Sequence, residues 1–260
     1  MNLYVPTPTL APIPINASSH PHKNIIDNIT TRNLAAFFII NLLRMLFSCL
    51  RFIVLKLIML ILPFTERDAD GIFKRSSEIL KDSGIIAYPT ESFYALGVLA
   101  MDENAVKKLY ELKQRPADKP LPIIVGDVDS LASIAKSIPA RAEALIRKYW
   151  PGPLTIIFEA KADVPVLLTG GRGKVAARVP GESVALHLAR ALNIPITSTS
   201  ANPSGRPPAE DTDAVINYFG NAVDLIIDGG KTPGGKPSTI VDVTVTPPKI
   251  LRKGSIVLPG

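Results

Sequence analysis

Three cations stand close together near the middle of the chain, where Lys113, Arg115 and Lys119 fall within seven residues. They come at the end of a predicted helix and in the proline-rich loop that follows it. Arginine presents a planar fork to two phosphate oxygens and lysine adds a mobile point charge, so this cluster suits a polyphosphate. Cations near a helix C-terminus also complement the helix dipole, which leaves a purely structural role open.

A second candidate site is the segment TSTSANPSG at 197–205, which follows the short apolar run 194–196. Hydroxyls and an amide packed this densely at a strand end can present several donors to one anionic or polar ligand. Gly205 permits the tight backbone path that such a loop needs. An ordinary Ser/Thr-rich turn has the same composition, so the segment alone does not decide between the two.

Three shorter pieces complete the candidate chemistry. The segment WPGPLT at 150–155 is a rigid turn before a strand and is typical of a packing element. Arg178 ends a predicted strand, where its guanidinium can meet a carboxylate, although a surface salt bridge is the commoner fate. Ser238 follows the glycine-rich stretch 229–235, and Arg252 follows the last predicted strand.

These residues must be positioned by an α/β domain, which we expect over 66–260. Helical periodicity at 73–82 stops at Gly84, and 85–88 is predicted to be a short buried strand. Asp102 is placed to cap the next helix. Further strands are expected at 121–125, 154–159, 175–179, 194–198, 223–227, 239–243 and 249–251. Further helices are expected near 129–149, 182–192 and 212–219. This alternation predicts a mixed sheet with flanking helices in a single globular domain.

The charge balance limits what can be inferred about partners. The net charge is +6, but residues 1–65 hold five basic residues and one acidic residue, so the remainder carries 24 minus 22, or +2. Anions must therefore be attracted by local clusters rather than by a general basic field. The only cysteine, Cys49, excludes a disulfide framework and fits a reducing, cytoplasmic compartment. The three histidines form no cluster along the sequence, so we expect no protein-held metal.

The N-terminal region has two parts. Residues 1–33 are proline-rich, lack a hydrophobic period and are predicted to be disordered. Residues 34–64 are predicted to form an apolar helix with a basic stripe, interrupted by Arg44, Arg51 and Lys56. Through 34–62 this helix could lie at a membrane surface or, less readily, span the membrane. Alternatively, the leader is not made and translation starts further along the chain, for example at Met45 or Met59.

Taken in order, seven segments resemble the Sua5/YciO/YrdC family, and the resemblance runs from about Gly84 to Ile256. The segments are YPTESFYALG at 88–97, KQR with the following KPL at 113–121, WPGPLT at 150–155, VAARVP at 175–180, STSANPSG at 198–205, STIVD at 238–242 and ILRKG at 250–254. The resemblance implies the twisted, mostly mixed YrdC-like sheet, in the short single-domain form of the family.

The same resemblance implies an activity. Family members make L-threonylcarbamoyl-adenylate and pyrophosphate from L-threonine, bicarbonate and ATP, which activates the group that a separate transferase places on tRNA. ATP is expected as a substrate with Mg²⁺, and no tightly bound cofactor is expected. No protein nucleophile is needed, because orientation and cations that stabilise the transferred charge supply the rate.

Site residues are carried over from the resemblance by position. The catalytic set is Lys113, Arg115, Ser200 and Asn202. The expected ATP contacts are Arg115, Lys119, Lys174, Ser200, Pro208 and Arg252. The expected threonine contacts are Ser92, Arg178, Ser198 and Ser238, with Arg178 pairing with the carboxylate.

The chain departs from the family pattern in the first segment, which usually reads PTDTVYGLG. Glu91, Ser92 and Ala95 replace Asp, Thr and Gly. Ser92 keeps the hydroxyl but lacks one methyl group, a change worth about 1 kcal/mol when such a group is buried. Lys174 stands where Thr is common and Pro203 where Leu is usual. These departures bear on substrate preference more than on reaction type.

Two other readings stay open. One is a carbamoyl-adenylate-forming enzyme like the related domain of hydrogenase maturation proteins. The other is a non-catalytic module that binds tRNA or double-stranded RNA on a basic concave face. Salt separates RNA binding from nucleotide binding, because contacts with an RNA backbone weaken steeply as the ionic strength rises.

Overall fold

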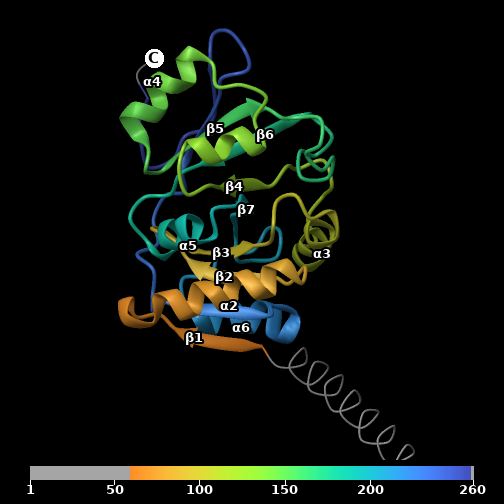
Figure 1. Ribbon diagram of the computed structural model, residues 1–260, viewed down its shortest axis with the longest axis vertical. Helices are drawn as coiled ribbons and strands as arrows, with labels where there is room; N and C mark the ends of the chain where they lie inside the picture. The colour runs from red at the N-terminus through yellow and green to blue at the C-terminus, as the bar shows by residue number, and fades with distance from the viewer. Residues whose placement is uncertain (1–58, 259–260) are drawn as a thin grey trace, which may run out of the picture. The chain divides into compact units, whose positions relative to one another are not determined.

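The computed structural model describes residues 59–258, which form two mixed β-sheets with flanking helices (Figure 1). All described residues belong to one compact unit. Within 59–258, no helix has the length and apolar character needed to cross a membrane. The predictions for 1–33 and for most of 34–64 lie outside the described residues.

The first sheet has five strands in the order β1-β9-β2-β3-β8. β1, β9 and β2 are parallel, and β3 and β8 continue antiparallel. The strands are β1 (Leu60–Pro63), β9 (Leu225–Asp228), β2 (Ile86–Pro89), β3 (Tyr94–Gly97) and β8 (Thr199–Ser200).

The second sheet has six strands in the order β11-β10-β5-β6-β4-β7. β10 runs parallel to β5 and β4 parallel to β6, while the other neighbours are antiparallel. The strands are β11 (Lys249–Arg252), β10 (Thr239–Asp242), β5 (Leu154–Glu159), β6 (Lys174–Arg178), β4 (Pro122–Ile124) and β7 (Ile196–Thr197).

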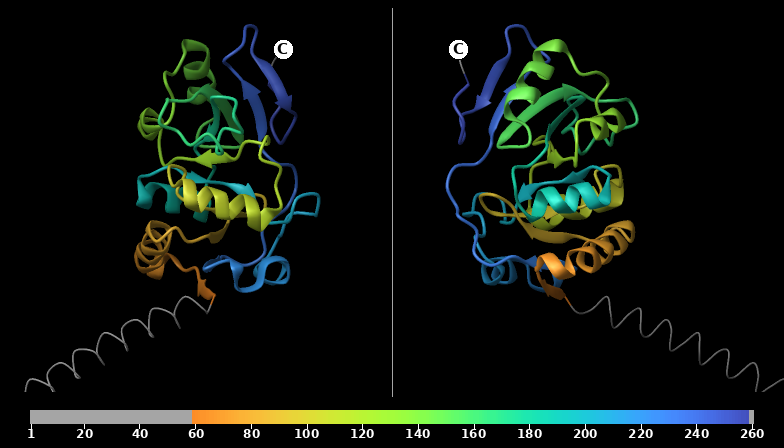
Figure 2. Two further views of the ribbon diagram at one scale, coloured as in Figure 1. Left: turned by 90° about the vertical axis from the view of Figure 1, so that its right-hand side faces the viewer. Right: turned by 60° about the vertical axis from the view of Figure 1, so that its left-hand side comes forward.

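Helices cover both faces of the five-stranded sheet (Figure 2). α2 (Ala69–Lys81) and α5 (Val184–Leu192) pack on one face, while α3 (Glu103–Lys113) and α6 (Thr212–Phe219) pack on the other. β2 shows why both faces are apolar, since Ile86 and Tyr88 enter one core cluster and Ala87 enters the other. α4 (Ala140–Tyr149) packs on the six-stranded sheet, and three short 3₁₀ turns occupy Glu66–Asp68, Asp129–Ser133 and Gly220–Ala222.

One short segment joins the two sheets. Ile196–Thr197 pairs with β4 in the second sheet, and two residues later Thr199–Ser200 pairs with β3 in the first. Thr197 and Thr199 are buried, whereas Ser198 is half-buried and Ser200 is exposed. This alternation is that of an extended chain, so the two serines face the same side. The Ser/Thr-rich segment is therefore a structural seam between the sheets.

The structure corrects several expectations. The expected single sheet is two sheets, because the strand predicted at 194–198 switches partners and becomes β7 and β8. The helix predicted near 129–149 is interrupted, and α4 begins only after Pro139, whose ring cannot continue a helix from the preceding turn. Leu60–Pro63, the end of the predicted helix 34–64, is an edge strand of the domain. β3 was not predicted, since YALG has no polar alternation to mark it.

Candidate active site

A cavity of about 480 Å³, counted with its open mouth, lies among loops of both sheets. Its walls come from the β2–β3 turn, the glycine-rich loop before β10 and the segment after β11. The lining residues include Glu91, Ser92, Gly234, Lys236, Ser238 and Ser255. Without that mouth the volume is about 210 Å³, below the roughly 300–1,000 Å³ common for small-molecule sites, so the cavity suits only a small ligand.

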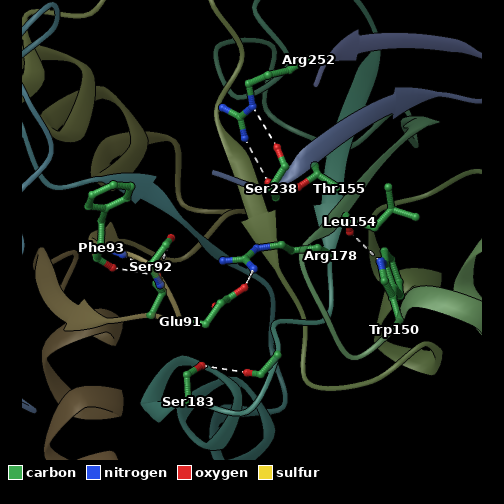
Figure 3. A network of polar contacts seen from close by, with 12 residues as sticks. Glu91, Ser92, Phe93, Trp150, Leu154, Thr155, Arg178, Ser183, Ser238 and Arg252 are labelled. Atoms are coloured by element: carbon green, nitrogen blue, oxygen red, sulfur yellow. Dashed lines mark hydrogen bonds and ion pairs between the residues drawn. The ribbon is translucent and has the colours of Figure 1, made fainter. Parts of the chain in front are cut away.

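Arg178 and Glu91 form an ion pair at this cavity (Figure 3). Arg178 is the last residue of β6, and Glu91 lies in the turn between β2 and β3, so the pair links the two sheets. Their side chains are only 11% and 22% exposed, respectively. The second carboxylate oxygen of Glu91, Oε2, is buried and has no hydrogen-bond partner among residues 59–258. Arg178 thus meets a carboxylate, as its position predicted, but that carboxylate belongs to the protein.

Ser238 lies beside this ion pair, and its hydroxyl is hydrogen-bonded to two side chains. Its hydroxyl shares a 2.8 Å hydrogen bond with Thr155 Oγ1 and accepts one of 3.0 Å from Arg252 Nη2. Arg252 Nε also donates to the Ser238 carbonyl at 3.0 Å, so its guanidinium folds back over this residue. Burial of the guanidinium lowers the pKa of Arg252, and the nearby charge of Arg178 lowers it further. The two guanidinium groups are therefore close enough to repel each other.

Ser198 lies against the buried phenol of Tyr88, beneath the same region. The phenol donates to the Thr197 carbonyl at 2.8 Å, and burial raises its pKa well above the usual value. Its environment includes the Ser198 hydroxyl and the charges of Arg178 and Glu91. Ser92, Arg178, Ser198 and Ser238, the four residues expected to hold threonine, are thereby brought into one neighbourhood.

Lys113 forms the centre of a second cluster. It ends α3, which begins at the predicted cap, since the Asp102 carboxylate accepts from the backbone N–H groups of Asn104 and Ala105. The Lys113 side chain is 2% exposed, and its ammonium donates to the carbonyls of Ser200 at 2.5 Å and Asn202 at 2.6 Å. The ammonium is thus anchored to the seam between the sheets.

The electrostatics of Lys113 are unusual for a lysine. Burial, and after it the charge of Arg115, lower its pKa to about 7. Among the ion pairs of residues 59–258, none joins Lys113 to an acidic side chain. A buried cation without a counter-ion is costly. An anionic ligand at this point would supply the missing charge.

The Asn202 and Arg115 side chains shape the loops around Lys113. Asn202 Oδ1 accepts from the Ser200 hydroxyl at 2.5 Å, and its Nδ2 donates to the carbonyls of Pro203 and Arg206. Arg115 donates to the carbonyls of Lys119 and Pro120, both at 3.0 Å, and burial lowers its pKa. Lys119 itself is exposed. The predicted catalytic set therefore contains Lys113, Ser200 and Asn202 in mutual contact, with Arg115 bracing the adjoining loop.

Two predicted ATP contacts, Lys174 and Pro208, are not among the residues that line the cavity. Lys174 pairs with Asp242 at 3.3 Å and begins β6, four residues before Arg178, a separation of about 13 Å along a strand. Pro208 is half-buried in the loop after the seam and precedes Ala209, whose N–H donates to the Ala201 carbonyl at 3.1 Å, next to Ser200 and Asn202. Lys174 joins neither of the clusters described above.

Sequence reasoning missed part of the lining. Lys236 and Ser255 were not singled out, and Glu91 was noted only as a departure from the family pattern. The glycine-rich composition of the loop carrying Lys236 was the available signal, because such loops often approach ligands closely. No sequence signal paired Glu91 with Arg178, which lies 87 residues further along the chain.

Comparison with known proteins places this chain among described relatives. The family model Sua5_yciO_yrdC, described as "Telomere recombination", matches residues 78–254. A protein of Pyrococcus abyssi named threonylcarbamoyl-AMP synthase is 40% identical over 199 residues, covering 76% of this chain and 58% of that protein. A protein of the same name from Idiomarina loihiensis is 40% identical over 162 residues, covering 62% of this chain and 87% of that protein.

A solved structure shows that this chain shares the fold of one of these relatives. The crystal structure of P. abyssi Sua5 complexed with L-threonine superposes with a TM-score of 0.70 at 39% identity, covering 76% of this chain and 57% of that one. The chain thus spans just over half the length of the P. abyssi relative. Since the family model covers more than half of the chain and the fold agrees, the chain belongs to the Sua5/YciO/YrdC family.

Proposed function

We propose that this chain is an L-threonylcarbamoyladenylate synthase. The amino group of L-threonine first combines with bicarbonate to give N-carboxy-threonine and water. An oxygen of this carbamate then attacks the α-phosphorus of ATP, and pyrophosphate leaves as threonylcarbamoyl-AMP forms. A separate transferase would pass the group to tRNA. The names of the relatives and the L-threonine in the P. abyssi structure support this assignment.

The observation that carries the proposal is the buried ammonium of Lys113. It is fixed by two backbone carbonyls, and no acidic partner is found for it within 59–258. An ammonium has three donors, so one remains for a phosphate oxygen. A cation held in advance where negative charge develops stabilises the transition state without reorganisation. We assign ATP contacts to Arg115, Lys119, Ser200 and Arg252 as well. Lys174, which pairs with Asp242, would need to rearrange to take part.

The second cluster is proposed to hold threonine. Ser92, Ser198 and Ser238 offer hydroxyls around Arg178, which is chemically suited to a small hydroxy amino acid with a carboxylate. The charge of Arg178 contributes to the lowered pKa of Arg252, so the two guanidinium groups lie near each other, which would put the amino acid close to the phosphate contacts. This proximity is what in-line attack on the α-phosphorus requires.

Magnesium enters the proposal as part of the ATP substrate. No three His, Cys, Asp or Glu side chains in the described part of the chain gather closely enough to hold an ion. The triphosphate oxygens are then the ligands expected for Mg²⁺, which usually keeps several waters. Bound in this way, the ion would neutralise charge on the departing pyrophosphate.

The product tests the assignment directly. The full chain would be incubated with L-threonine, bicarbonate and MgATP, and the mixture analysed by liquid chromatography and mass spectrometry for threonylcarbamoyl-AMP. We expect the adduct and its AMP breakdown product. Their absence, together with RNA binding that collapses as salt rises, would contradict the assignment and favour an RNA-binding module.

ATP binding should take up protons at Lys113. The pKa of its ammonium is about 7 without ligand, so at pH 8 the group is mostly neutral, and bound phosphate favours the charged form. We expect an uptake approaching one proton per ATP at pH 8, and little at pH 6, where Lys113 is already protonated. Calorimetry in buffers of different ionisation enthalpy measures this quantity. Equal uptake by Lys113→Met would show that another group is responsible.

Lys236 should contribute a weaker phosphate contact. It lines the cavity, whereas Lys231 in the same loop approaches Glu210 at 3.8 Å and is outside the lining. We expect Lys236→Ala to raise the KM for ATP about 3- to 10-fold, the scale of one exposed charge-assisted contact. Lys231→Ala is the matched control and should leave KM unchanged. An equal effect of the two substitutions would indicate only a general field of the loop.

A further inference from the structure

The ion pair between Arg178 and Glu91 stands where the proposed function puts the carboxylate of the amino acid. Glu91 lines the cavity, and its partner is the only guanidinium in the predicted threonine set. Among the described residues that line the cavity, Glu91 is also the only acidic one. A substrate carboxylate that takes Arg178 must therefore compete with, or displace, a carboxylate already there.

The Glu91 carboxylate is not fully hydrogen-bonded in the structure. One oxygen is bound to Arg178, while Oε2 is buried and finds no hydrogen-bond partner in the described part of the chain. A buried carboxylate oxygen with no donor is destabilising, so this position resists displacement less than a fully bonded one. Once displaced, however, the carboxylate still needs a positive partner, because an unpaired charge in a partly buried site is costly.

We propose that an α-amino acid binds by inserting into this ion pair, and that Glu91 determines the selection of its amino group. The substrate carboxylate takes the Arg178 guanidinium, and the substrate ammonium takes the Glu91 carboxylate. Two protein charges and two substrate charges are then all paired. This inference rests on the proposed function, since it specifies how the same site recognises threonine.

Insertion into an ion pair excludes a particular class of ligand. A 2-hydroxy acid carries the carboxylate but no ammonium, so it would remove Glu91 from Arg178 and leave the Glu91 charge unpaired. Removing the charge of Glu91 should shift the preference from the amino acid toward the hydroxy acid. The hydroxy acid would then find Arg178 free, while the amino acid would lose the partner of its ammonium.

The test compares two ligands of nearly equal shape. L-Threonine and its 2-hydroxy analogue, 2,3-dihydroxybutanoate, would be titrated by calorimetry into the full-length chain and into Glu91→Gln. For the unsubstituted protein we expect threonine to bind at least about 10-fold more tightly. For Glu91→Gln we expect that ratio to fall by at least about 10-fold, with the hydroxy acid binding more tightly than before. Glu91→Asp keeps the charge and should retain most of the preference.

A matched control is Glu182→Gln, which removes an exposed carboxylate that pairs with His187, outside the cavity lining. It should leave the ratio unchanged. If Glu91→Gln retains the preference, the inference is wrong while the proposed function stands. If the unsubstituted protein binds no threonine, the proposed function itself fails and the inference with it. If Glu91→Gln does not fold, equal binding of the two ligands by the unsubstituted protein overturns the inference without any variant.

Discussion

Replacement of Lys113 by methionine is expected to lower the rate of pyrophosphate release at least about 100-fold, the scale found when one preorganised donor to a developing negative charge is lost. Methionine keeps the apolar stem in the space that the buried lysine fills and removes only the ammonium. The loss should appear in kcat, because the third donor of Lys113 is assigned to a phosphate oxygen whose charge grows during transfer. Steady-state kinetics with saturating threonine and bicarbonate measure it.

Stability should change much less in the same variant. The carbonyls of Ser200 and Asn202 lose their donor, but the cost of burying the ammonium disappears as well. Because these effects oppose each other, we expect the free energy of unfolding to change by less than about 2 kcal/mol. Lys107→Met, on an exposed position of α3, is the control for a lysine lost from the same helix. A folded Lys113→Met protein within threefold of normal activity would contradict the assigned role.

Arg178→Met is expected to raise the KM for L-threonine at least about 100-fold, because it removes the guanidinium assigned to the carboxylate. It should also lower the free energy of unfolding by about 1–3 kcal/mol, since Glu91 is left without its partner in a largely buried position. Substrate kinetics and chemical denaturation measure the two effects separately.

The double variant Glu91→Gln/Arg178→Met separates recognition from structure. Removing both charges should restore most of the stability, because no unpaired carboxylate remains. It should not restore threonine binding. Recovery of a normal KM in the double variant would show that Arg178 acts only by holding Glu91 in place, and that threonine's carboxylate is bound elsewhere.

Local signals in the sequence predicted some elements well. β5 has the predicted bounds because LTIIFE is a dense apolar run after a rigid turn, and α6 lies at 212–219 as expected. The capping of α3 by Asp102 also follows from sequence, since a cap is a contact between residues two or three positions apart. Lys113 ends that helix and Arg115 follows it in the loop, as expected.

Long-range pairing could not be predicted in the same way. The two-residue strands β7 and β8 belong to different sheets, and nothing in TSTS indicates where the change of partner occurs. The Arg178–Glu91 and Lys174–Asp242 pairs join residues 87 and 68 positions apart. The sequence left a salt bridge open for Arg178 without identifying its partner, and Lys174 was expected to contact ATP. Both have acidic partners in the structure that only the folded arrangement of β6 reveals.

The most direct test follows pyrophosphate release by the full chain with ATP and magnesium, omitting L-threonine and bicarbonate in turn. We predict release only when both are present, since the carbamate formed from them is the nucleophile. Release should fall at least about 100-fold in Lys113→Met. Release that ignores threonine, or none from the folded protein with all substrates present, would contradict the assignment as a threonylcarbamoyladenylate synthase.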